Sequence, residues 1–150
     1  MQNATDFFQT PPSGQPVSPP ITDEAQACAA VLVACLHANE LYGMTENAAF
    51  HATIRNRNIF KGQDAQALVA TAEQYYEQAG GAAALIDAAI GAIREQTRLP
   101  LFYQCLDVML ADGLVTPREH TIIQYLKGKF NVRNGALEKG LEVLLAKNQL

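Results

Sequence analysis

The segment 112–119 contains the signals for the end of one helix and the start of the next, only a few residues apart. Gly113 tolerates the left-handed backbone conformation that closes a helix. Thr116 is a favourable N-cap, Pro117 suits the first helical position, and Glu119 stands at the third position, where it completes a capping box. The segment therefore predicts a tight corner between two helices.

Helical signals run through the whole chain after residue 21. Thr22 predicts the N-cap of a first helix. The middle of that helix, 27–36, is apolar on every side, which is typical of a helix in the centre of a bundle. Asp64 predicts the cap of the third helix, and Gly80 predicts its end.

The other helices are predicted from the same kinds of signal. No strand-length run alternates between polar and apolar residues. About seven helices with short connections predict an all-α, compact, bundle-like domain. We expect the second helix to be capped by Thr45, the fourth to follow Gly81, the fifth to run from near Pro100 to Asp112, the sixth from Pro117 to about Phe130, and the seventh to follow Asn134 with a stripe of Leu137, Leu141, Leu144 and Leu145.

The chain divides into a proline-rich segment, 1–21, and a single helical domain, 22–150. The first segment is predicted to be a tail or linker, or to dock through Phe7 and Phe8. Within the domain, 35–50 and 105–122 share the pattern of an apolar helix turning into a threonine-capped helix. This similarity indicates either two pseudo-repeated helical halves or two hairpins that are alike by chance.

Composition excludes several classes of function. The net charge of -4 and the lack of a basic stripe argue against nucleic-acid binding. The longest apolar run, 27–36, is shorter than the ~20 residues that span a bilayer, and no signal peptide is evident. The three cysteines, Cys28, Cys35 and Cys105, form no Cys-x-x-Cys pair and are expected to be small buried hydrophobes in a reducing compartment. We expect a cytoplasmic protein.

The sequence offers no catalytic signature. It contains no Gly-x-Ser-x-Gly, Walker loop or His-Glu-x-x-His motif. The two serines, Ser13 and Ser18, lie in the proline-rich segment, and Cys35 and His37 are two apart on a helix, so their side chains point apart. We therefore expect a protein that is not an enzyme, with no catalytic or cofactor-binding residues.

The pattern Ala-Asp-Gly-x-x-Thr-x-x-Glu at 111–119, between two helices, resembles the TerB-like family, which is named for tellurite resistance. The resemblance implies an all-helical domain in which paired acidic residues at such corners bind metal ions. It also implies a role in a stress or tellurite-resistance pathway.

Four carboxylates are the candidate metal ligands. Asp112 ends a helix beside unpaired carbonyl groups, and Glu119 follows in the next first turn. Glu40 and Glu46 flank the equivalent first corner, so adjacent corners would bring four carboxylates to one divalent ion of open identity. However, the capping box alone explains Glu119. Aligned on Thr45, neither Glu40 nor Glu46 occupies a position of the family pattern.

The sequence leaves open the roles of two other ionisable residues, His37 and Asp107. His37 and Glu40 are three apart on one helix and can share a ligand. Asp107 stands among apolar residues, so it lies on a solvent-exposed edge of its helix or needs a buried partner.

The alternative function is a metal-free helical module that binds another protein or a second copy of the chain.

Overall fold

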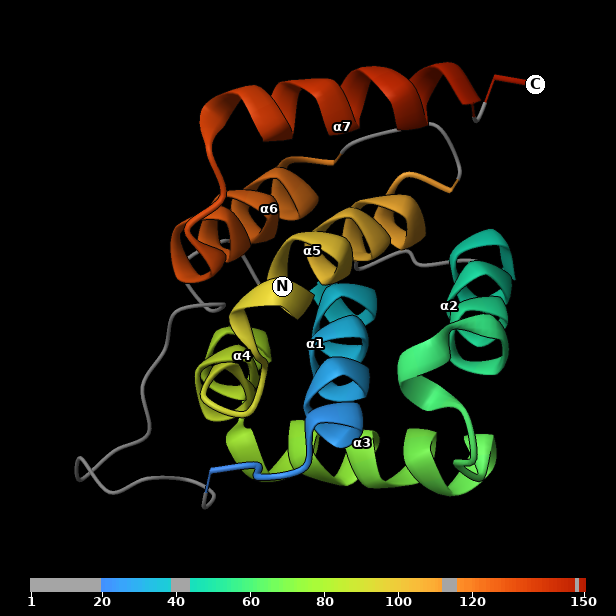
Figure 1. Ribbon diagram of the computed structural model, residues 1–150, viewed down its shortest axis with the longest axis vertical. Helices are drawn as coiled ribbons and strands as arrows, with labels where there is room; N and C mark the ends of the chain where they lie inside the picture. The colour runs from blue at the N-terminus through green and yellow to red at the C-terminus, as the bar shows by residue number, and fades with distance from the viewer. Residues whose placement is uncertain (1–19, 39–43, 112–115, 148) are drawn as a thin grey trace.

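The computed structural model describes residues 20–38, 44–111, 116–147 and 149–150; the side chains of 44–46 lie outside that description. The described residues form helices and no strand, which confirms the all-α prediction (Figure 1). The elements are α1 (Glu24–Ala38), α2 (Met44–Asn56), the 3₁₀ helix η3 (Asn58–Phe60), α3 (Ala65–Ala79), α4 (Ala82–Ile90), α5 (Glu95–Met109), α6 (Pro117–Phe130) and α7 (Asn134–Lys147).

Helix α1 is the centre of the molecule, as its apolar sequence predicts. Every residue from 27 to 36 is buried. The helix contacts α2, α3, α4, α5 and α6, which surround it in Figure 1. Its alanines and cysteines are small, so neighbouring helices can approach its backbone from several sides.

Local capping signals predicted the ends of α3 correctly. The Asp64 carboxylate accepts hydrogen bonds from the backbone N–H groups of Gln66 and Ala67 at 3.0 and 3.2 Å. Gly80 closes the helix in the left-handed conformation, with φ of 83°. At α1 the prediction was wrong by one residue, because Asp23 rather than Thr22 accepts from the backbone N–H of Gln26, at 2.8 Å.

The predicted starts of α2 and α5 need correction. Helix α2 begins at Met44, so Thr45 lies within its first turn rather than before it. Helix α5 begins at Glu95, and Pro100 lies inside it. The side chain of the N-cap residue Arg94 makes no capping hydrogen bond, so no N-cap pattern marks this helix start in the sequence.

The last two points of the fold are the position where α5 ends and the packing of α7. Helix α5 ends at Met109, before the predicted Asp112, and Asp112 lies outside the described residues. Helix α7 lies along one side of the molecule against α5 (Figure 1). Its apolar stripe packs on the core as predicted, with Leu137 buried and Leu141, Leu144 and Leu145 partly buried. None of the described helices is long and apolar enough to cross a membrane.

Candidate functional site

The start of α6 has the capping box that its sequence predicts. The Thr116 hydroxyl oxygen accepts a hydrogen bond from the backbone N–H of Glu119 at 3.1 Å. In return, the backbone N–H of Thr116 donates to Oε1 of Glu119 at 2.9 Å. Pro117 occupies the first helical turn, where its missing N–H costs no hydrogen bond. The second half of the predicted corner is therefore confirmed.

Glu119 is completely buried, with 0 % of its surface exposed. Glutamate is rarely found at such depth unless its charge is compensated. The Thr116 N–H provides one compensating hydrogen bond, and the positive N-terminal end of α6 favours a negative group at this position. Glu119 is therefore a carboxylate held in the interior at the beginning of a helix.

The structure describes one of the four predicted metal ligands. Asp112 and Glu40 lie outside the described residues. The backbone of Glu46 lies in the first turn of α2, but its side chain is outside the description. Within the described ranges no group of three or more His, Cys, Asp or Glu side chains is arranged to hold a metal ion. The convergence of the four carboxylates remains a prediction.

His37, at the end of α1, pairs with a residue that sequence reasoning missed. Its Nε2 atom lies 2.8 Å from Oε2 of Glu73 on α3. The ring of Tyr76, one turn further along α3, stacks on the imidazole at a centroid separation of 4.0 Å. Glu73 and Tyr76 are three apart and so share a helix face. That spacing was visible in the sequence, but the partner across the helices was not.

Arg118, in the first turn of α6, lies near the group formed by His37, Glu73 and Tyr76. Burial raises the pKa of the Tyr76 hydroxyl, and the nearby Glu73 carboxylate raises it further, whereas the Arg118 cation opposes the rise. Arg118 is therefore close to Tyr76, although it precedes Glu119 at the start of α6. The imidazole of His37, the carboxylate of Glu73 and the guanidinium of Arg118 therefore lie around Tyr76.

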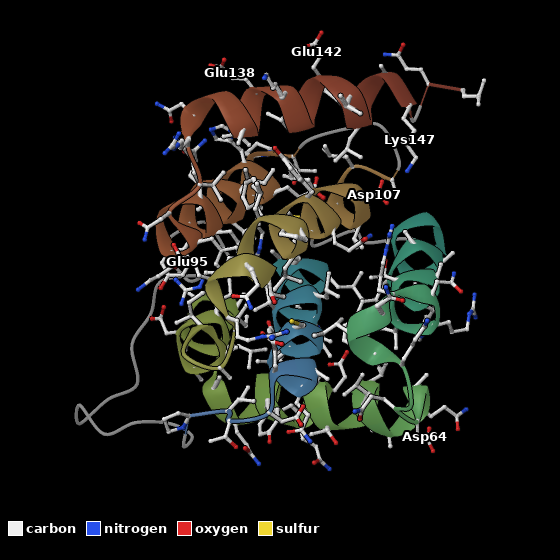
Figure 2. The ribbon with its side chains drawn as sticks, in the orientation of Figure 1. Asp64, Glu95, Asp107, Glu138, Glu142 and Lys147 are labelled. Atoms are coloured by element: carbon white, nitrogen blue, oxygen red, sulfur yellow. The ribbon has the colours of Figure 1, made fainter. Side chains whose placement is uncertain are left out.

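Asp107 has a partner and belongs to a different part of the molecule. Nζ of Lys147 on α7 lies 3.1 Å from its Oδ1, and the two side chains lie side by side in Figure 2. The Asp107 side chain is 24 % exposed, so it lies at a solvent-exposed edge of α5, and the Lys147 cation lies beside it. Its role is to connect α5 to α7.

The three thiols are free and buried, as predicted. Burial raises the pKa of Cys28 to about 12. Burial also raises the pKa of Cys105, and a hydrogen bond with Cys35 adds to the rise. A thiol needs to lose its proton to act as a nucleophile or a strong metal ligand. Cys28 and Cys105 are therefore packing residues at neutral pH.

Comparison with known proteins identifies the family. The family model described as Tellurite resistance protein TerB matches residues 25–139, which is most of the chain and includes α1 through the first part of α7. Searches of the curated proteins and of the solved structures give no match. The all-helical fold, the corner motif at 111–119 and this match over most of the sequence agree, and the chain belongs to the TerB family.

Proposed function

We propose that this TerB-family chain is a non-enzymatic protein of a stress or tellurite-resistance pathway that binds a divalent metal ion at its acidic corners. Asp112 and Glu119 are the principal ligands, and Glu40 and Glu46 approach from the other corner. The observation that carries the proposal is the complete burial of the Glu119 carboxylate beside the corner that contains Asp112.

The position of Glu119 suits a metal ligand. Its Oε1 atom is fixed by the Thr116 backbone N–H, so the carboxylate does not have to be ordered when an ion binds. Hard cations such as Ca²⁺ and Mg²⁺ prefer carboxylate and carbonyl oxygens. Asp112 follows the last turn of α5, where backbone carbonyl groups lack helical partners and can serve as further ligands.

The chemistry of the described interior supports a binding role rather than catalysis. The buried thiols of Cys28 and Cys105 have raised pKa values, so neither is a thiolate at neutral pH. His37 is engaged by Glu73 and covered by Tyr76. A bound ion would instead join two helical corners and stabilise the folded state.

Calorimetric titration tests the metal proposal directly. Chelator-treated protein is titrated with Ca²⁺, Mg²⁺ and Zn²⁺, and we expect binding of at least one ion that Asp112→Asn abolishes and Glu119→Gln weakens. Glu138→Gln and Glu142→Gln are matched controls, because both carboxylates are exposed on α7 (Figure 2). The absence of heat with all three ions, or equal losses in the control variants, would contradict the proposal.

A second candidate function is that of a metal-free interaction module. Among the described residues, the large side chains of Leu99 on α5 and Val143 on α7 are 42 % and 63 % exposed. Such side chains can contact a protein partner or a second copy. Sedimentation from micromolar to millimolar concentration tests self-association: a growing dimer fraction supports it, and a single monomeric species excludes it.

A further inference from the structure

A cleft of about 280 Å³ lies between α1, the end of α2, η3 and the first half of α5. Its lining is mainly apolar and includes Leu32 of α1, Ile59 and Phe60 of η3, and Leu101 of α5. A cavity of about 150 Å³ with apolar walls is enough to hold benzene. The cleft therefore has room for a small organic molecule, and its walls favour an apolar one.

A polar pair on one wall has unused hydrogen-bonding capacity. Thr53 donates its hydroxyl proton to the carbonyl oxygen of Ala49 at 2.9 Å and accepts from Nε2 of Gln104 at 3.0 Å. The Gln104 amide has a second N–H and a carbonyl oxygen. Neither makes a hydrogen bond to another residue that the structure describes. Both residues line the cleft, so these groups are available to a bound polar atom.

Arg57 gives the cleft a positive rim. Its side chain is exposed, lines the cleft and forms no ion pair within the described residues. The Glu24 carboxylate, at the start of α1, is already paired with Arg94 at 3.0 Å. Cys28 lies beneath the cleft, and burial raises the pKa of its thiol to about 12, so it is neutral at pH 7. Among the described lining residues Arg57 is thus the ionised one.

We propose that this cleft binds a small monocarboxylic acid with an apolar tail. The carboxylate pairs with the Arg57 guanidinium, which can donate two parallel hydrogen bonds to it. The tail lies against Ile59 and Leu101. The second N–H of the Gln104 amide can donate to a carboxylate oxygen, whereas the single Thr53 hydroxyl proton is already given to the Ala49 carbonyl. Glu119, the proposed metal ligand whose side chain the structure describes, does not line the cleft, so octanoate binding and metal binding can be tested independently.

Octanoate is the probe, and octylamine and octanol are its charge-reversed and neutral counterparts. Each is titrated into the ¹⁵N-labelled full chain, and amide shifts are followed in the NMR spectrum. We expect octanoate to shift the amides of 57–60 and Gln104 most. We also expect it to bind more tightly than octanol, with octylamine weakest, because the rim is cationic.

Two variants locate the site. Arg57→Gln should weaken octanoate binding about three- to fivefold, the modest loss expected of an exposed ion pair, and should leave octanol binding unchanged. Arg55→Gln is the matched control, because Arg55 is exposed near the end of α2, two residues before Arg57, but does not line the cleft. Ile59→Trp should fill the cleft and remove binding of both probes, with circular dichroism used to confirm that the variant folds.

The site is supported if octanoate binds more tightly than octanol, octylamine binds most weakly, and the variants have the effects given above. No amide shift with millimolar octanoate overturns it, and so does octylamine binding as tightly as octanoate. If Ile59→Trp does not fold, the comparison of Arg57→Gln with Arg55→Gln decides alone: an equal effect of both rejects the carboxylate site.

Discussion

Thr116 makes both hydrogen bonds of the α6 capping box, one through its hydroxyl oxygen and one through its backbone N–H. Removal of the hydroxyl leaves the Glu119 backbone N–H without its partner at a helix end. It also loosens the turn that holds the buried Glu119 carboxylate. The stability of the corner and the geometry of the proposed metal ligand therefore depend on the same residue.

We predict that Thr116→Ala lowers the free energy of unfolding by about 1 kcal/mol, as is typical for loss of an N-cap. Urea denaturation measures the change. Thr121→Ala is the control, because the Thr121 hydroxyl donates to the Pro117 carbonyl inside the helix and caps nothing. Its effect should stay within about 0.5 kcal/mol. Equal losses in the two variants would show that the capping box contributes no stability of its own.

Helix α7 is attached to α5 through a close approach at Gly140. A Cβ atom at this position would lie 2.6 Å from Cε1 of Tyr103 and 3.2 Å from Cδ1 of Leu106. The Tyr103 ring cannot move away freely, because its hydroxyl donates to the Ala136 carbonyl oxygen at 3.0 Å. The Lys147 to Asp107 ion pair joins the same two helices further along (Figure 2). Glycine is therefore required here for packing.

We predict that Gly140→Ala destabilises the protein by about 1–3 kcal/mol, the usual cost of overpacking. This loss exceeds the gain of up to about 1 kcal/mol that alanine gives in a helix interior. Gly128→Ala in α6 is the matched control, since a Cβ there would meet nothing within 4 Å. It should stabilise the protein. Thermal melts compare the two variants, and a higher melting temperature for Gly140→Ala would disprove the packing argument.

At the scale of the whole molecule, Glu24 joins the beginning of α1 to the beginning of α5. Its Oε2 accepts from the Arg94 backbone N–H at 2.8 Å, and its Oε1 accepts from the Arg94 guanidinium at 3.0 Å. Burial raises the pKa of Glu24, but the hydrogen bonds from Arg94 and Thr97 outweigh this, so the net pKa lies below 4.5. The folded state therefore favours the ionised carboxylate.

The stability from this contact is present above the unfolded-state pKa of about 4.5 and is lost as the pH falls through the lower folded-state pKa. We predict that Glu24→Gln costs about 1 kcal/mol at pH 7, because the Arg94 side chain is largely exposed. The difference from wild type should shrink as the pH falls below about 4.5. Denaturation at several pH values measures it. Glu142→Gln, on the exposed side of α7, should show no such dependence, and a constant difference for Glu24→Gln would contradict the linkage.

The sequence by itself determined the features that depend on neighbours within one helical turn. The Asp64 cap, the Gly80 end and the box between Thr116 and Glu119 all join residues two to four positions apart, so local residue chemistry specifies them. The unbroken apolar run at 27–36 likewise requires burial on every side, which is enough to place α1 in the centre.

Tertiary structure decided whatever depends on residues far apart in the chain. Helix α5 starts at Glu95 because a carboxylate 70 positions away accepts the Arg94 N–H, and no local pattern contains that information. In the same way, Glu73, which pairs with His37, lies 36 positions away on α3. The cleft with Arg57 exists only where α1, α2, η3 and α5 meet. Hydrogen bonds and ion pairs between helices, and the clefts that several helices line, form only when the helices pack together.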